Sequence, residues 1–339
     1  MDAASDFVCL TLCVRLPAMY ILRAYNTHPT LDSRFSILDP EVRVRVHYTA
    51  YCTHTNFHME DSLRVLSLFD GISCGQRALA DAQVPVSAYY ASEVDPKAIA
   101  VTQSNFPETI QLGSVERVKG HDLPTIDLLI AGSPCQGFSQ QGNQEGFANK
   151  GSGLYSHFLR ILQETRPRWF LLENVKMQPV CASRISTDLG VPPLQLNSRY
   201  WVPQNRERLY WTNIPCALKL PPDSGPPHLG DLVGKGYEGV YATPHGYFKG
   251  GFKERCAVAP CVTRTGWLSS FSLVQGGQRR KFTLEEVERL QGLPAGYTQA
   301  GGSNSSRVAL LGNAWTVPTV ASLLEGVRPA NEGALLPCT

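Results

Sequence analysis

Short apolar runs alternate with segments of helical spacing between residues 63 and 172, and this alternation constrains the fold more than any other feature of the chain. Four runs of this kind predict strands: Leu63–Phe69, Ser87–Ser92, Thr125–Ala131 and Trp169–Leu172. Strands that alternate with helices pair in parallel through right-handed crossovers. The pattern therefore predicts an α/β domain built on a mostly parallel sheet.

Helix signals lie between these runs and near the end of the chain. Asp95–Pro96 pairs a capping carboxylate with a proline at the first helical position, and Thr283–Glu286 has the spacing of a capping box. Helices are predicted over five segments: 75–83, 95–105, 154–164, one opening at 283, and 317–327.

The chain divides into four parts by its patterning. Residues 1–58 hold four of the eight histidines without a sustained period, and we expect either a poorly ordered extension or a start site placed too far upstream of Met59. Residues 59–211 form the main core. Residues 212–278 have no helical period and are rich in Gly, Pro, Tyr and Lys, which predicts a small irregular or β-rich insertion. Residues 279–339 return to the core.

The net charge of +2 does not by itself indicate a polyanionic partner, but the charged residues are unevenly distributed along the chain. Between Arg199 and Arg289 there are 13 Lys and Arg residues against 8 Asp and Glu, so a nucleic-acid interface is expected in the second half of the chain. No apolar run approaches the roughly 18 residues that a membrane helix requires, so no membrane partner is predicted.

The ten cysteines contain no CxxC pair. Cys9 with Cys13, Cys256 with Cys261, and the Cys52, His54 and His58 cluster are weak metal candidates. Free thiols in a reducing compartment fit this scatter better, and no metal site is predicted.

Pro134–Cys135 follows the apolar run that ends at Ala131, after a small-residue turn. The carboxyl ends of parallel strands are where ligands of open α/β sheets bind. A cysteine there is placed to act as a nucleophile if nearby positive charge favours its thiolate. A structural cysteine in a loop is the alternative.

Glu173 similarly follows the run that ends at Leu172. A partly desolvated glutamate at this edge can donate a proton at neutral pH. A carboxylate that caps the next segment is the alternative.

Phe69-Asp70-Gly71 forms a glycine-bearing turn after the first predicted strand, and Glu93 ends the second. Such a turn lets the backbone approach a cofactor closely, and an acidic residue about 20 positions later suits a ribose diol. The turn lacks GxGxxG, which favours an adenosyl ligand without a pyrophosphate.

Taken in order, these elements resemble the DNA (cytosine-5)-methyltransferase family, with similarity to compact phage and bacterial enzymes and features of the animal de novo enzymes. The motifs are FDGISCG, ASEVD, GSPCQGFS, LLENV, QNRER, ERLQGLP and GNAWTVP, between Leu63 and Val327. The resemblance implies a Rossmann-like S-adenosylmethionine-dependent fold with a mostly parallel seven-stranded sheet and a small target-recognition insertion at 212–278.

The resemblance also implies a role for each catalytic residue. Cys135 is expected to attack carbon 6 of cytosine, and Glu173 to hold ring nitrogen 3 and supply a proton there. Arg208 is expected to reach the exocyclic oxygen, with Arg206 orienting the site. A basic pair at the surface is the alternative for the two arginines.

The family's binding residues map onto further positions of this chain. S-adenosyl-L-methionine is expected to contact Phe69, Asp70, Gly71, Glu93, Val94, Ser114, Asn313 and Trp315, and the target base Pro134, Gln136, Ser139 and Asn174. Two positions depart from the family pattern. Ser114 stands where an aspartate commonly binds the adenine amino group, and Val94 where many members carry a larger stacking residue.

The implied partner is double-stranded DNA, because a stacked cytosine must be flipped out before a thiol reaches carbon 6. Loop 140–153 is expected to close over the flipped base. Cations and aromatics of 212–278, among them Arg264 and Trp267, are expected to contact DNA phosphates and a groove. The sequence does not show whether a restriction endonuclease accompanies the enzyme. The implied compartment is the cytoplasm of a bacterium or phage-infected host, or the nucleus of a eukaryote. A tRNA cytosine-5 methyltransferase and a catalytically silent DNA-binding paralogue remain the alternatives.

Overall fold

The chain divides into two units in the computed structural model, residues 1–56 and residues 57–339. The structure describes residues 62–133, 153–215, 227–243, 250–265 and 267–327, together with two short strands of the first unit. Those strands, β1 (Thr11–Leu12) and β2 (Leu22–Arg23), pair antiparallel. The remaining residues of the predicted 1–58 extension lie outside the described part.

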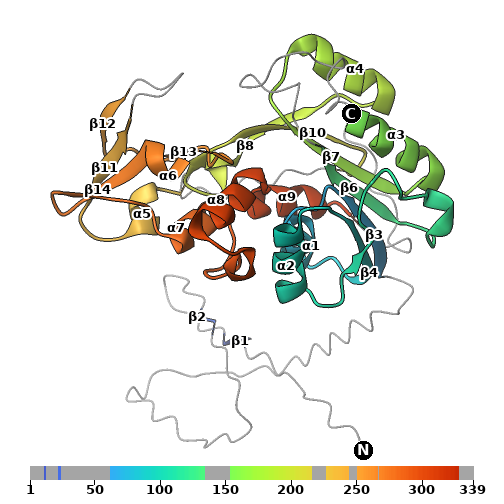
Figure 1. The fold of residues 1–339 in the computed structure, drawn as a ribbon, viewed down its shortest axis with the longest axis horizontal. Helices are drawn as coiled ribbons and strands as arrows, with labels where there is room; N and C mark the ends of the chain where they lie inside the picture. The colour runs from blue at the N-terminus through green and yellow to red at the C-terminus, as the bar shows by residue number, and fades with distance from the viewer. Residues whose placement is uncertain are drawn as a thin grey trace, which may run out of the picture. The chain divides into compact units, whose positions relative to one another are not determined.

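A seven-stranded sheet forms the centre of the second unit, in the order β5-β4-β3-β6-β7-β10-β8 (Figure 1). Its strands are β3 (Leu63–Leu68), β4 (Val86–Ser92), β5 (Ile110–Gln111), β6 (Leu128–Gly132), β7 (Trp169–Val175), β8 (Leu194–Asn197) and β10 (Glu207–Thr212). The strands from β5 to β7 are parallel, and β10 runs antiparallel to both of its neighbours. The expected mostly parallel seven-stranded sheet is therefore confirmed.

The four predicted strands correspond to β3, β4, β6 and β7. They read as nearly continuous apolar runs because both faces of the sheet are covered. Along β3, Val65 packs into one core cluster and Leu66 into the other. The same alternation places Ile130 of β6 on the first face and Leu129 on the second.

Helices cover both faces of this sheet (Figure 1). One core cluster joins the sheet to α1 (Cys74–Asp81), α2 (Pro96–Asn105), α7 (Leu284–Leu290), α8 (Asn304–Asn313) and α9 (Val317–Leu324). The opposite cluster joins it to α3 (Gly153–Thr165) and α4 (Pro179–Leu189). None of the described helices is long and apolar enough to cross a membrane.

The predicted helix starts have the expected caps. Asp95 Oδ1 accepts a hydrogen bond from the Lys97 N–H at 2.9 Å. Thr283 and Glu286 form the complete capping box at the start of α7, with Glu286 accepting from the Thr283 N–H at 2.8 Å. These bonds satisfy N–H groups that have no partner within the helix.

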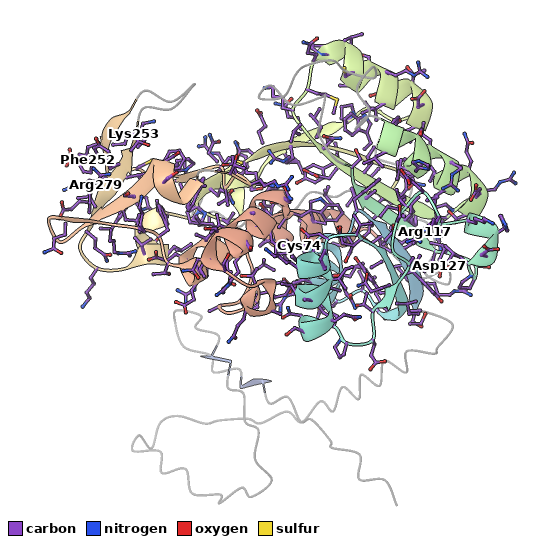
Figure 2. The ribbon with its side chains drawn as sticks, viewed as in Figure 1. Cys74, Arg117, Asp127, Phe252, Lys253 and Arg279 are labelled. Carbon is purple, nitrogen blue, oxygen red and sulfur yellow. The ribbon has the colours of Figure 1, made fainter. Side chains whose placement is uncertain are left out.

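The insertion is β-rich, as the sequence predicted. A four-stranded antiparallel sheet has the order β12-β11-β14-β15. Figure 2 labels Phe252, Lys253 and Arg279 on it. Its strands are β11 (Tyr237–Ala242), β12 (Gly251–Glu254), β14 (Phe271–Gln275) and β15 (Gln278–Arg280), and two short helices, α5 (Leu229–Val233) and α6 (Trp267–Ser270), accompany it.

A separate two-strand pair ties the insertion to the main domain. Strand β13 (Ala259–Pro260) runs parallel to β9 (Gln204–Asn205), which directly precedes β10. Trp267, one of the aromatics expected near DNA, is instead 1% exposed and packs against Phe271 and Phe282. Because its indole ring is buried in the core, Trp267 cannot enter a DNA groove.

Candidate functional site

A cavity of about 480 Å³ opens at the carboxyl ends of β3, β4, β6 and β7. Parallel strands end at the same edge of a sheet, so the turns that follow them face one space. The cavity brings together every predicted site residue that the structure describes. They are Phe69, Asp70, Gly71, Glu93, Val94, Ser114, Glu173, Asn174, Arg206, Arg208, Asn313 and Trp315.

The turn after β3 is held by Glu93 at the end of β4. Glu93 Oε2 accepts from the Gly71 N–H at 2.8 Å, and Oε1 accepts from the N–H groups of Val94 and Asp95 at 2.7 and 2.9 Å. Gly71 has φ +59°, which favours glycine. A carboxylate has about four acceptor sites, so Glu93 keeps capacity for a ribose diol while it braces the turn.

Asp70 places a carboxyl group in the cavity wall. Tyr89 donates to its Oδ1 at 2.8 Å, and Ser73 donates to its Oδ2. Burial raises the pKa of the Asp70 carboxyl to about 6, although hydrogen bonds from Ser73, Ser67 and Tyr89 oppose the shift. The group therefore changes charge close to neutral pH.

Ser114 and Val94, the two positions that depart from the family pattern, both line the cavity. Ser114 follows Gly113, whose carbonyl accepts from the Ser92 hydroxyl at 2.7 Å. Val94 is 67% exposed at the cavity rim, and Asn313 is also exposed. A serine hydroxyl replaces a charged acceptor here, and a small apolar side chain offers little stacking area.

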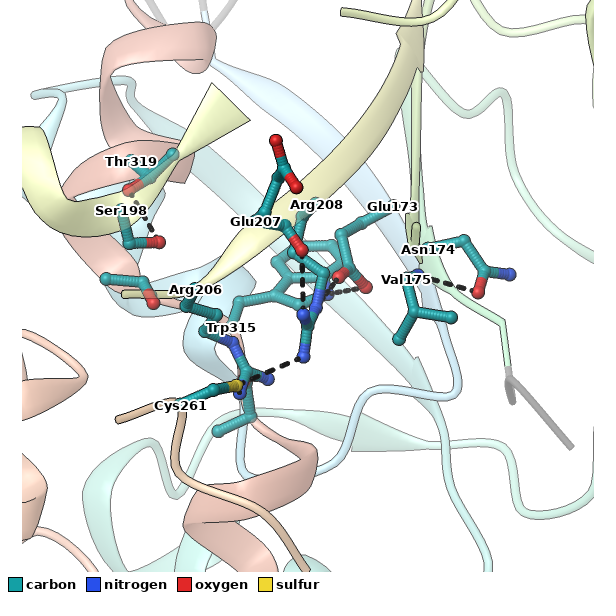
Figure 3. A network of polar contacts seen from close by, with 12 residues as sticks. Glu173, Asn174, Val175, Ser198, Arg206, Glu207, Arg208, Cys261, Trp315 and Thr319 are labelled. Atoms are coloured by element: carbon teal, nitrogen blue, oxygen red, sulfur yellow. Dashed lines mark hydrogen bonds and ion pairs between the residues drawn. The ribbon is translucent and has the colours of Figure 1, made fainter. Parts of the chain in front are cut away.

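Glu173 is held by two donors from distant parts of the chain (Figure 3). Arg208 Nε lies 3.1 Å from Glu173 Oε1, and Trp315 Nε1 donates to Glu173 Oε2 at 3.0 Å. The carboxylate is nearly buried and the guanidinium largely so. These contacts leave the carboxylate little freedom to rotate.

Strand register explains how Arg208 reaches Glu173. In the antiparallel pair of β10 with β7, Tyr210 lies opposite Glu173 and Arg208 opposite Val175. Directly opposed residues share a face, so Arg208 is the diagonal neighbour of Glu173, within reach of a long side chain.

Arg206 has a different role from Arg208. It is 3% exposed, and its guanidinium donates to Val262 O at 2.9 Å, Ala314 O at 2.7 Å and Gly312 O at 3.1 Å. These bonds connect the residue between β9 and β10 with the insertion and with the C-terminal end of α8. The alternative of a basic pair at the surface is therefore wrong, because both guanidinium groups are enclosed.

Trp315 is packed between glycines as well as bonded to Glu173. A Cβ atom at Gly132 would lie 2.7 Å from Trp315 Nε1, and one at Gly75 would lie 3.3 Å from the Trp315 ring. The absence of side chains at these two positions lets the indole reach the edge of the sheet. The sequence predicted Trp315 in the cofactor pocket but not its bond to Glu173.

The end of β6 is joined to the end of β7 beside the cavity. Asn174 Nδ2 donates to Ser133 Oγ at 2.8 Å, and both residues are buried. Ser133 is the last described residue before residues 134–152. Predicted residues Pro134, Cys135, Gln136 and Ser139, and loop 140–153 apart from Gly153, lie outside the described part.

The structure gives two residues positions beside the cavity that the sequence did not predict. Arg264, which was expected to contact DNA phosphates, lines the cavity. Cys261 lies next to both arginines, with Arg206 Nη1 donating to its sulfur at 3.3 Å. Nothing in the local sequence marks either residue, because the segments they join are more than 50 positions apart.

The α/β fold of this chain is shared with solved methyltransferase structures. The fold matches Schizosaccharomyces pombe Dnmt2 methyltransferase (TM-score 0.56, 20% identity, 78% of this chain and 98% of that chain). It also matches the Entamoeba histolytica methyltransferase EhMeth (TM-score 0.60, 14% identity, 78% and 97%).

The family is given by sequence. Residues 63–178 match the C-5 cytosine-specific DNA methylase family. The chain is 27% identical over 303 residues to the type II methyltransferase M.NlaX of Neisseria lactamica, covering 79% of this chain and 96% of that protein. It is 34% identical over 165 residues to the orphan methyltransferase M.SPRI of Bacillus phage SPR, but spans only 38% of that relative. The resemblance that the motifs predicted is therefore confirmed by the match of residues 63–178 to this family.

Proposed function

We propose that this protein methylates carbon 5 of cytosine in double-stranded DNA, with Cys135 as the nucleophile. One observation carries the proposal: Glu173, Arg208 and Trp315 meet at the cavity edge where Ser133 leads into Pro134–Cys135. Cys135 is two residues beyond Ser133, and two residues of chain span at most about 7 Å. The length of chain therefore allows the Cys135 thiol to approach the bonded carboxylate.

The proposed chemistry begins with the Cys135 thiolate forming a bond to carbon 6 of a flipped cytosine. Electron density then moves toward carbon 5 and ring nitrogen 3. Glu173 stabilises it by giving a proton to nitrogen 3, and Arg208 approaches the exocyclic oxygen. After carbon 5 is methylated, a base removes its hydrogen as a proton, and elimination breaks the sulfur–carbon 6 bond. The proton on nitrogen 3 then returns to Glu173.

The methyl donor proposed is S-adenosyl-L-methionine, which supplies a methyl group on a positively charged sulfonium. The cavity fits it: the Gly71 turn allows close approach, Glu93 retains acceptor capacity for a diol, and Asp70 offers a buried carboxylate toward cationic groups. Gly71, Glu93 and Asp70 would bind and orient the donor, and Phe69 and Trp315 would exclude water.

The proposed setting is the cytoplasm of a bacterium or of a phage-infected cell, because the curated relatives come from bacteria and Bacillus phages. These relatives give no support to the nuclear alternative.

The test is transfer of a radiolabelled methyl group to duplex DNA and to tRNA by the wild-type chain and Cys135→Ala. We expect labelled 5-methylcytosine in duplex DNA with wild type alone. Duplexes containing 5-fluorocytosine should become covalently trapped on wild type, because fluorine blocks the final proton removal. Transfer to tRNA alone, or no transfer to either substrate, contradicts the proposal.

A further inference from the structure

Cys261 contacts both arginines of the site (Figure 3). Arg206 Nη1 donates to Cys261 Sγ at 3.3 Å, and Arg208 Nη2 lies 3.9 Å from the same sulfur. On its other side, the Arg208 guanidinium faces Glu173. Arg208 Nη1 also donates to Glu207 O at 2.8 Å. The Arg208 guanidinium thus contacts a carboxylate, a carbonyl and a sulfur atom.

The backbone around Cys261 fixes the sulfur in place. The preceding residues, Ala259 and Pro260, pair with strand β9 at Gln204 and Asn205. The following residue, Val262, donates its N–H to Gln204 Oε1 at 2.8 Å and accepts from Arg206 at 2.9 Å. Because both flanks are bonded, the Cys261 backbone keeps its position without relying on contacts of the sulfur.

Charge within the cluster favours a negative sulfur. Two guanidinium groups face one carboxylate, Glu173, so a thiolate at Cys261 would balance the second positive charge. Burial acts to raise the pKa of the Cys261 thiol, but the charges and hydrogen bonds of Arg206 and Arg208 outweigh it, so its pKa lies below the usual value.

The other titratable groups acting on the arginines stay protonated. Tyr210 acts on both arginines from β10, and Cys74 acts on Arg206 from α1. Burial raises the pKa values of both groups, that of Cys74 to about 12. Of the two thiols, Cys261 is therefore the one whose negatively charged form the arginines favour.

We infer that Cys261 is a positioning residue that holds the Arg208 guanidinium against Glu173 for the methyl-transfer step. This inference rests on the proposed function. When the thiol is protonated, its hydrogen can point to Val262 O at 3.6 Å, and the arginines lose their negatively charged neighbour. Arg208 then keeps its contacts with Glu173 and with Glu207 O but loses its charged neighbour on the side of the sulfur, so turnover falls as pH falls through the thiol's pKa.

The experiment measures kcat and KM for S-adenosylmethionine from pH 6 to 9 for wild type and three variants of Cys261. Cys261→Ala should lower kcat about tenfold at pH 8, which corresponds to a modest loss of transition-state stabilisation. KM for S-adenosylmethionine should stay within about twofold. Cys261→Ser, which restores an acceptor without charge, should be intermediate and lack the thiol-dependent change. Cys261→Asp, which restores the charge, should recover more kcat than Ser.

Cys256 provides the matched control, because its thiol donates to Val258 O at 2.9 Å in the same segment. Cys256→Ala should leave kcat and its pH profile unchanged. An alanine variant within twofold of wild-type kcat, a parallel change in kcat and KM, or an Asp variant no better than Ala overturns the inference. Wild-type methylation in the same assay separates these results from failure of the proposed function itself.

Discussion

Trp315 donates its indole N–H to Glu173 Oε2 at 3.0 Å, across 142 positions of sequence. The bond joins the segment between α8 and α9 to the end of strand β7, and it reaches the oxygen that Arg208 leaves free. The C-terminal segment therefore helps to orient the carboxylate proposed to act on the target base.

This bond predicts that Trp315→Phe lowers kcat about 10- to 100-fold, because a hydrogen bond to a charged group contributes roughly 1.5–3 kcal/mol. Glu173→Gln should lose more, since it removes the carboxyl group proposed to act on ring nitrogen 3. Steady-state methyl transfer at saturating DNA and cofactor measures both. Trp201→Phe, away from the cavity, serves as the control. A Trp315→Phe enzyme with wild-type kcat would show that the bond does not orient Glu173 during turnover.

The two arginines should separate stability from catalysis. Arg206→Met leaves three carbonyl acceptors without their donor and should destabilise the fold by about 3–5 kcal/mol. Arg208→Met should lower kcat about 100-fold with a much smaller loss of stability, because its main partner is Glu173 at the cavity edge. Urea unfolding and kinetics on both variants check this. Equal loss of stability in the two variants would contradict the division.

Cofactor affinity should depend on pH through Asp70. Its pKa is raised from 3.8 to about 6, mainly by burial, so the carboxyl is ionised at pH 8 and largely neutral at pH 5. The negative charge attracts a cationic cofactor, and affinity should weaken as pH falls through 6. Calorimetric titrations from pH 5 to 8 measure this.

Asp70→Asn should bind the cofactor weakly at pH 8 and lose most of the pH dependence. Asp127→Asn, whose carboxylate accepts from the Arg64 N–H outside the cavity, is the control (Figure 2). The folded state binds the Asp70 proton more tightly than the unfolded chain. This group's contribution therefore makes the fold less stable as pH rises from about 4 to 6. Unchanged affinity between pH 5 and 8 is the contrary result.

Ser114 offers a gain-of-affinity test. Ser114→Asp should tighten S-adenosylmethionine binding about five- to tenfold, since a charge-assisted hydrogen bond to the adenine amino group is stronger than one to a hydroxyl. The hypoxanthine analogue of the cofactor lacks that amino group and should gain nothing. Equal gains for both ligands would place the adenine elsewhere.

A chain that starts at Met59 should keep both fold and activity. The described sheet begins with β3 at Leu63, which belongs to the core, and residues 57–339 form a unit of their own. We expect a thermal midpoint within about 2 °C of the full chain and kcat within about twofold. Loss of either would assign residues 1–58 a part in the enzyme.

Strand positions could be predicted because the sheet is covered on both faces. A strand buried on two sides must be apolar at every position, as Leu128 to Ala131 are, and such a run stands out in sequence. Strands β8 and β10 carry polar residues such as Gln195, Glu207 and Arg208, which mask that signal. The two strands at the antiparallel end of the sheet were therefore not predicted from the sequence.

The sequence by itself determined the chemical inventory: which carboxylates follow buried strands, and the period-two spacing of Gln204, Arg206 and Arg208. That spacing places three side chains on one face but does not distinguish them. Only the tertiary structure decided that Arg206 bonds to backbone carbonyls while Arg208 reaches Glu173. It also brought Trp315 and Cys261 to the same two groups. Such contacts depend on how segments far apart in the chain pack together, and that packing cannot be predicted from the local sequence.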